Sequence, residues 1–369
     1  MKNKGTVVLF EDNEDIRGQI VESFTKQEKQ FELRDIDNDD AKSIQEIADA
    51  SGEAFAIEEV IASYITENIK DARLILVDHD LTQYNSYMSE PSIVAAARTL
   101  NIPVCRYHRK RKSSALPDYN TWKINNNFFS IELDSNNFDE MASAALSIMH
   151  AFNNIRDVYS SIDKEVKQYG PAYALSNILG RSDQYDHLKL YSNVISIAFD
   201  IINISDIDTE DHPSFNWEQR TAYILSYWLY NSILKFPGII LNRTATASFL
   251  NINVDEFSSP TISKCFSGAK YDGPFGDIND YWWRSDLELI VEEHDDINDY
   301  IKSQGCEERV SPCMCSENSD IYAGYYDLLN NKPISLEESV GNLSWIPTGA
   351  DLTRLNKARY EELAPIINF

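Results

Sequence analysis

The stretch LILVD, from Leu74 to Asp78, is an apolar run of leucine and β-branched residues that ends on an acid. Such a run is typical of a buried parallel strand, and ligands of open α/β sheets bind outside the carboxyl ends of the strands. A second run, TVVLF, ends in the same way with Glu11 and Asp12. If the two strands are neighbours, three carboxylates meet at one sheet edge. They repel one another unless a cation neutralises them, and an oxygen-only cluster suits Mg²⁺.

The string VVLFEDNE, followed later by LILVD, resembles the receiver domain of bacterial two-component response regulators. The likeness covers about residues 1–150 and nothing after them. It implies a flavodoxin-like domain in which a histidine kinase phosphorylates Asp78. It also implies that Glu11, Asp12 and Asp78 bind Mg²⁺ with the backbone carbonyl of Asp80.

Alternating apolar patterns continue through this region. They predict a parallel five-stranded sheet with further strands at 31–36, 102–107 and 128–133, and helices at 13–26, 40–50, 58–69 and 91–100. Receiver domains have one helix where this chain has the two patterns separated by Ser51-Gly52, so we expect an insertion there.

The pattern departs from the family at the ends of two strands. Receivers carry Thr or Ser after the fourth strand and Lys after the fifth, and both contact the phosphoryl group. This chain has Tyr107-His108 and Glu132-Leu133 at those places. A glutamate there repels a phosphoryl group, so the metal pocket can persist while the ordinary response is altered.

A basic stretch from Arg106 to Lys112 holds five Arg or Lys residues in seven. Its candidates for phosphate contact are Arg106, His108 and Lys110. The alternative interpretation is a solvated loop.

From Asp139 onward the apolar residues follow a heptad-like spacing of four and three. The seam consists of Met141, Ala145, Ile148, Phe152, Ile155, Tyr159, Ile162 and Val166. We expect a connector helix over 139–169, ended by Gly170-Pro171. Two partners for the seam are open: a second copy, giving a homodimer through 141–166, or the chain's own second domain.

The sequence patterns divide the rest of the chain into domains. We expect a receiver-like domain at 1–138 and, after the connector, a mainly α-helical output or adaptor domain at 170–369. Helical patterns cover 188–204 and 222–236, and Asn242 can cap a short helix. The aromatic string from Tyr271 to Arg284 fits either a binding surface or core packing around a turn. No nucleophile elbow, P-loop or Rossmann glycine motif is present.

The length and the net charge of the chain limit the kinds of function that it can have. With 369 residues, the chain exceeds the usual single domain. A formal charge of −26 opposes sequence-independent binding to nucleic acid or anionic membranes. The sequence has no long apolar run and no h-region of a signal peptide, so we expect a cytoplasmic protein.

Four cysteines of the C-terminal half are candidate metal ligands: Cys265, Cys306, Cys313 and Cys315. Their spacing fits no standard zinc motif.

These features predict a bacterial signalling protein that accepts a phosphoryl group at Asp78 from a histidine kinase or another phosphorelay protein. Among receiver proteins that lack a DNA-binding output, some belong to phosphorelays in phage-defence operons, so the resemblance includes that setting as one expectation. Two alternatives remain: an enzyme regulated by the receiver, with its active site in the C-terminal domain, and an interaction module with a degenerate receiver.

Overall fold

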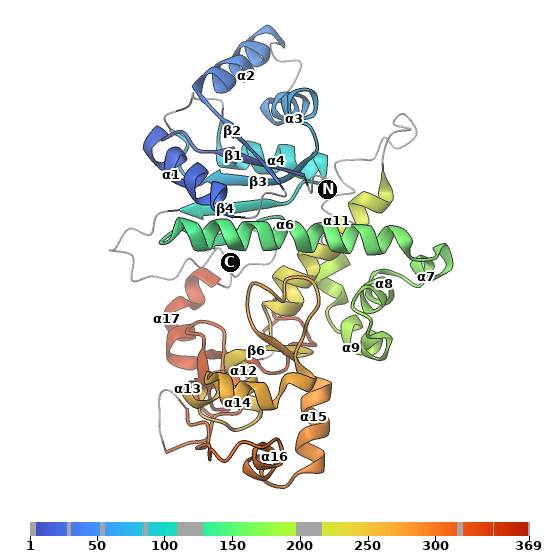
Figure 1. Cartoon of the computed structure of the whole chain (residues 1–369), viewed down its shortest axis with the longest axis vertical. Helices are drawn as coiled ribbons and strands as arrows, with labels where there is room; N and C mark the ends of the chain where they lie inside the picture. The colour runs from blue at the N-terminus through green and yellow to red at the C-terminus, as the bar shows by residue number, and fades with distance from the viewer. Residues whose placement is uncertain are drawn as a thin grey trace. The chain divides into compact units, whose positions relative to one another are not determined.

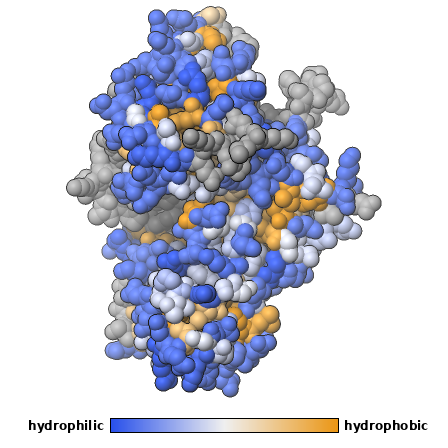
Figure 2. All heavy atoms as spheres, viewed as in Figure 1, coloured by the Kyte–Doolittle hydropathy of each residue, from blue (hydrophilic) through white to orange (hydrophobic). Residues whose placement is uncertain are grey.

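The computed structural model describes residues 5–27, 31–51, 56–82, 84, 88–108, 128–196, 216–315, 320–341 and 343–367. The chain forms two compact units. Unit 1 comprises Met1–Leu116, Asn127–Ser160 and Ser214–Tyr227, and unit 2 comprises Pro117–Asn126, Ser161–Pro213 and Trp228–Phe369. Hydrophilic residues cover most of the face of the molecule drawn in Figure 2, in line with the high net charge.

Unit 1 is built on a five-stranded sheet whose neighbouring strands are all parallel, in the order β2-β1-β3-β4-β5. This confirms the predicted parallel five-stranded sheet. The interior strand β1 is buried along its whole length, as expected when both faces of a parallel sheet are covered. The strands are β1 (Thr6–Phe10), β2 (Glu32–Ile36), β3 (Ala72–Asp78), β4 (Val104–His108) and β5 (Ile131–Asp134).

Helices flank this sheet (Figure 1). Apolar residues of α2 (Asn38–Ser51), α3 (Ile57–Asn68) and α4 (Glu90–Leu100) share one core with alternate residues of the central strands. The helix α1 (Glu14–Thr25) begins at Asn13, whose side chain accepts hydrogen bonds from two backbone N–H groups of the first turn. The two helices α2 and α3 between β2 and β3 confirm the two helical patterns predicted there.

The heptad-spaced segment forms two helices instead of the single predicted connector. The first, α6 (Phe138–Ser161), ends where Ser160 Oγ donates a hydrogen bond to the carbonyl of Arg156, and α7 (Lys164–Gln168) follows. Six seam side chains from Met141 to Tyr159 are buried within the single chain. The side chain of Val166 lies outside the described residues. A homodimer through 141–166 stays a prediction.

Most of helix α11 (Trp217–Trp228) belongs to unit 1, although it lies far along the chain. The ring of Tyr223 stacks on Phe129, with 5.7 Å between the centroids and 5° between the planes. The Tyr227 hydroxyl accepts a buried 2.8 Å hydrogen bond from the N–H of Val104, the first residue of β4. Phe152 of α6 packs edge-on against the same tyrosine. Helix α11 is therefore part of the core of unit 1.

Unit 2 is largely helical, as predicted, but it also contains two small sheets that the sequence patterns did not indicate. One pairs β6 (Ile240–Asn242) with β7 (Tyr281–Trp283), and the other has the order β10-β11-β8-β9. The strands of the second sheet are β8 (Tyr325–Asp327), β9 (Lys332–Ile334), β10 (Ser339–Val340) and β11 (Thr353–Asn356).

The helices of unit 2 are short. The predicted helical pattern at 222–236 begins in α11. It continues in unit 2 as a π-helix, η4 (Leu229–Leu234), which ends before Pro237-Gly238, as predicted. Asn242 caps α12 (Arg243–Phe249), which confirms the predicted cap. The others are α8 (Pro171–Ile178), η3 (Ser182–Gln184), α9 (Tyr185–Lys189), α13 (Val254–Phe257), α14 (Pro260–Cys265), η5 (Ser267–Ala269), α15 (Arg284–Glu293), α16 (Ile297–Ser303) and α17 (Lys357–Ile367). None of the described helices combines the length and apolar character needed to cross a bilayer.

Candidate functional site: an acidic cluster at the edge of the sheet

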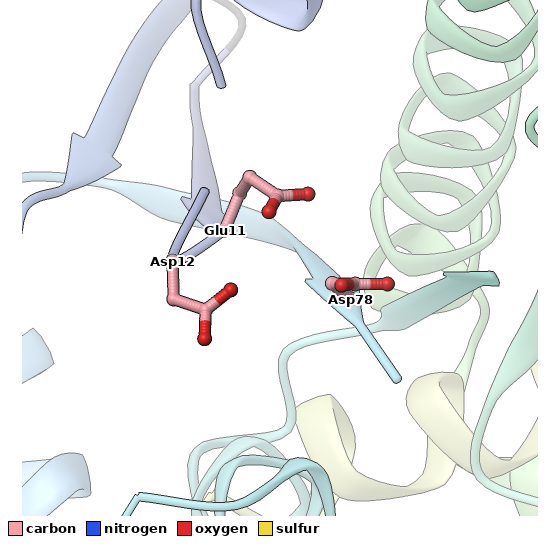
Figure 3. Close-up of side chains that lie close together, drawn as sticks. All are labelled: Glu11, Asp12 and Asp78. Carbon is pink, nitrogen blue, oxygen red and sulfur yellow. The ribbon is translucent and has the colours of Figure 1, made fainter. Parts of the chain in front are cut away.

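Three carboxylates meet at the carboxyl edge of the sheet in unit 1. Because β1 and β3 are adjacent and parallel, with Phe10 opposite Val77, the residues that follow them lie side by side. One oxygen from each of Glu11, Asp12 and Asp78 lies within 4.8 Å of the others. Figure 3 shows Glu11 and Asp12 leaving the end of β1 and Asp78 at the end of β3. The sequence prediction that these three side chains converge is therefore confirmed.

The carboxylate of Glu11 is fully buried and accepts two hydrogen bonds. The N–H of Asn13 donates to Oε1 at 2.9 Å, and the hydroxyl of Tyr107 donates to Oε2 at 2.7 Å. The net pKa of Glu11 is raised to about 7, mainly by burial. The two hydrogen bonds lower this pKa, and the charges of Asp78 and Asp12 raise it. Glu11 thus carries a proton for part of the time at neutral pH unless a cation is bound.

The backbone of Glu11 is held by the hydroxyl of Tyr84. That oxygen lies 2.9 Å from the carbonyl of Glu11 and 2.5 Å from the carbonyl of Ile36, and it accepts a 3.2 Å hydrogen bond from the N–H of Glu11. A single hydroxyl proton serves the two carbonyls in turn. Tyr84 therefore connects the ends of β1 and β2 and fixes the strand end that carries the cluster.

Asp78 is the most accessible of the three acids, because it is only partly buried while Glu11 and Asp12 are 0% and 4% exposed. Its Oδ1 accepts a 2.8 Å hydrogen bond from the N–H of His79, and the N–H of Asp80 also donates to the carboxylate. Burial raises the pKa of Asp78 to about 6, against the lowering effect of the His79 hydrogen bond. Asp78 is mostly ionised at neutral pH.

The donor set fits Mg²⁺. It offers hard oxygen atoms of three acids, and the charged neighbours that raise the pKa values of Glu11 and Asp78 are other carboxylates. In the part of the chain that the structure describes, this is the one group of three or more His, Cys, Asp or Glu side chains close enough to hold a metal ion. Glu11, Asp12 and Asp78 would be its protein ligands.

A chain of charged groups links the residue that follows β3 to strands β4 and β5. Arg106 of β4 forms an ion pair with Glu90 at 2.8 Å and a second ion pair with Glu132 of β5. Nδ1 of His79 lies 2.8 Å from the other carboxylate oxygen of Glu90. The guanidinium of Arg106, a predicted phosphate contact, is thus engaged by two glutamates.

The other predicted phosphate contacts cannot be located in this way. His108 ends strand β4, but its side chain lies outside the described residues, as does all of Lys110. Their contact with a phosphoryl group stays a prediction.

Sequence reasoning missed the residues that support the cluster. Tyr107 was noted as a departure from Thr or Ser, and its register directly opposite Asp78 across β3 and β4 could have suggested that its hydroxyl enters the site. Tyr84 and Glu90 gave no signal, because they lie outside the strands and reach Glu11 and His79, respectively, through tertiary folding alone.

The cysteines do not form a metal group among the described residues. Cys315 lies 3.2 Å from a carboxylate oxygen of Glu338, whereas Cys313 lies 3.9 Å from the hydroxyl of Ser248. In the aromatic string, Tyr271, Trp282 and Trp283 are buried, as core packing predicts.

The chain matches no protein-family model, no curated protein sequence and no solved structure.

Proposed function

We propose that unit 1 is a flavodoxin-like receiver domain that accepts a phosphoryl group at Asp78 with the aid of Mg²⁺. The single observation that carries this proposal is the convergence of Glu11, Asp12 and Asp78 within 4.8 Å at one sheet edge. The strand order β2-β1-β3-β4-β5 supports it, because flavodoxin-like sheets have this order and bind ligands at the same edge.

Asp78 is the acceptor that accessibility and charge favour. Glu11 and Asp12 are almost completely buried, and both oxygens of Glu11 already accept hydrogen bonds. Asp78 is partly exposed and mostly ionised at neutral pH, so one carboxylate oxygen can approach a donor in solution.

In the proposed reaction, a carboxylate oxygen of Asp78 attacks the phosphorus of the donor in line with the leaving atom. A new P–O bond forms while the bond to the leaving group breaks, and its electron pair departs with acetate or with the imidazole of a kinase histidine. Glu11, Asp12, Asp78 and the backbone carbonyl of Asp80 would hold Mg²⁺, which would supply positive charge to neutralise the transferring oxygens. Tyr107 and Tyr84 keep Glu11 in position throughout.

The response to phosphorylation should differ from that of ordinary receivers. Thr or Ser and Lys are replaced by Tyr107 and by Glu132, and Arg106 pairs with Glu132 and Glu90. We propose that a phosphoryl group on Asp78 acts on this charged chain, with His108 and Lys110 as further contacts, and that the conformational response is weak.

A second candidate is an interaction module that binds its partner without phosphoryl transfer. The observation in its favour is that both carboxylate oxygens of Glu11 already accept hydrogen bonds within the chain, from the N–H of Asn13 and the hydroxyl of Tyr107. In that case the cluster would stabilise the domain but would not react.

For the biological setting we propose a partner histidine kinase or another phosphorelay protein, with an output through protein contacts and a phage-defence phosphorelay as one such context. The test is phosphoryl transfer from an autophosphorylated histidine kinase. Transfer to the wild-type chain but not to Asp78→Asn supports the proposal. A kinase that binds the chain without transferring its phosphoryl group supports the interaction module instead.

A further inference from the structure

Two cysteines of unit 2 that lie far apart in the sequence are neighbours in the fold. The thiol of Cys265, the last residue of α14, has the thiol of Cys306 as a side-chain hydrogen-bond partner. Both cysteines are free, and their side chains keep small exposed fractions of 9% and 7%. The proposed phosphoryl chemistry in unit 1 uses neither of them.

A turn at the end of α16 places Cys306. Gly305 has a φ of +82°, in the left-handed region that favours glycine. The chain therefore turns back, and the N–H of Cys306 donates a 3.3 Å hydrogen bond to the carbonyl of Ile301. This is the long-range bond of a Schellman motif, which closes the last turn of a helix. Cys306 is thus held at the last turn of α16.

A second set of contacts joins the end of α14 to α16 without involving either thiol. The hydroxyl of Tyr300 in α16 donates a 2.9 Å hydrogen bond to the carbonyl of Cys265. The ring of Tyr300 also packs on Phe266, with 5.3 Å between the centroids. Backbone and aromatic contacts therefore keep the two cysteines together, and their proximity does not depend on the oxidation state of sulfur.

The surroundings of the pair favour sulfur chemistry over metal binding. Among the residues that the structure describes, no third His, Cys, Asp or Glu side chain joins Cys265 and Cys306 at a distance suited to a metal ion. A structural zinc site needs four such ligands. Burial, and then the charge of Cys306, raises the pKa of Cys265, so this group is mainly a thiol at neutral pH. The reduced pair therefore persists until an oxidant is supplied.

We propose that Cys265 and Cys306 form a reversible disulfide on exposure to a peroxide, and that this bond fixes α14 to the end of α16. One thiolate attacks an oxygen of hydrogen peroxide, so an S–O bond forms, the O–O bond breaks, and a sulfenic acid and water result. The second thiolate attacks the sulfenic sulfur, so the S–S bond forms, the S–O bond breaks, and a second water leaves. Two thiols are oxidised, one peroxide is reduced, and the two thiol protons leave in the waters. A dithiol restores the thiols by exchange.

The disulfide would close a loop that contains β7 and α15. Closing a long loop removes conformations from the unfolded chain, which stabilises the folded state. The oxidised chain should therefore melt at a temperature higher by about 5 °C or more than the reduced chain.

The test treats the reduced full chain with a small excess of hydrogen peroxide, which catalase then removes. Remaining thiols are alkylated before digestion. Mass spectrometry should find the peptide that contains Cys265 linked to the peptide that contains Cys306, and dithiothreitol should separate them. Circular dichroism should show the higher melting temperature of the oxidised chain, and dithiothreitol should reverse the increase.

Cys306→Ser should abolish both the link and the increase in melting temperature. Cys313→Ser is the matched control, because Cys313 is another buried cysteine of unit 2 whose sulfur lies beside Ser248, and it should retain both effects. A folded wild-type chain in which Cys265 and Cys306 stay open to alkylation, or are oxidised further without a link, overturns the proposal. So does a linked chain that melts no higher than the reduced one.

Discussion

The hydroxyl of Tyr107 donates a 2.7 Å hydrogen bond to Oε2 of Glu11, and both side chains are buried beside Asp78. The neutral hydroxyl of Tyr107 therefore stabilises the ionised carboxylate of Glu11, whereas the charges of Asp78 and Asp12 destabilise it. The result is a site with a rigid geometry in which the total charge depends on pH and on bound cations.

The first prediction concerns pH. The pKa of Glu11 is about 7 and that of Asp78 about 6 in the folded chain, whereas both groups titrate near 4 when unfolded. Between about pH 4 and 7 the folded state binds more protons than the unfolded state, so the free energy of unfolding falls as pH rises. Glu11 should contribute on the order of 2–3 kcal/mol to this loss.

Urea unfolding in EDTA at several pH values measures this effect. Glu11→Gln cannot ionise, so its stability should fall less over the same range. Parallel pH profiles for the variant and the wild type would mean that the pKa of Glu11 is not raised.

The second prediction concerns Tyr107→Phe. At pH 8 Glu11 is mostly ionised, and loss of the hydroxyl removes a hydrogen bond to a buried charge, at a cost of about 1.5–3 kcal/mol in the free energy of unfolding. At pH 5 Glu11 is protonated and the cost should be nearer 1 kcal/mol. Tyr322→Phe is the control, because Tyr322 is 62% exposed and should tolerate the change at both pH values. A cost that does not vary with pH would argue against the charge-assisted bond.

The third prediction concerns Mg²⁺. A cation that binds only the folded chain raises its melting temperature, and a concentration of 100 times Kd adds about 2.7 kcal/mol to the free energy of unfolding. The rise should be smaller in Asp12→Asn and absent in the double variant Asp12→Asn/Asp78→Asn. Asp157→Asn changes an exposed acid of α6 and should keep the full response. Equal melting of the wild type in Mg²⁺ and in EDTA would count against the metal site.

The fourth prediction concerns Tyr227→Phe. The hydroxyl of Tyr227 accepts the N–H of Val104, and the variant leaves that buried donor without its partner. The free energy of unfolding should fall by about 1–3 kcal/mol. Tyr169→Phe, at a site that is 69% exposed, should have little effect. Equal stability of the two variants would show that the hydrogen bond between Tyr227 and Val104 does not stabilise unit 1.

Much of unit 1 could be predicted from its sequence. Apolar patterns located the five strands and the helices of the sheet, including the two helices between β2 and β3. The acids Glu11, Asp12 and Asp78 were identifiable because each follows a buried strand. Local patterns of this kind depend only on the periodicity of strands and helices.

Other features depend on tertiary contacts that periodicity does not encode. The tyrosines of α11 indicated burial, but nothing in their spacing showed that they pack on Phe129 and Val104 in unit 1. The heptad seam continued past Ser161, although helix α6 did not, because apolar spacing shows which face of a helix is buried and not where the helix ends. The small sheets of unit 2 have strands of two to four residues, too short for an alternating pattern to be recognised.

The most direct test of the central claim is to map the phosphorylated residue after treatment with acetyl phosphate and Mg²⁺. Tandem mass spectrometry of the peptide that contains Asp78 should show an acyl phosphate on that residue, and omission of Mg²⁺ or the substitution Asp78→Asn should abolish it. A wild-type chain that stays unlabelled, under conditions in which Mg²⁺ demonstrably raises its melting temperature, would contradict the account.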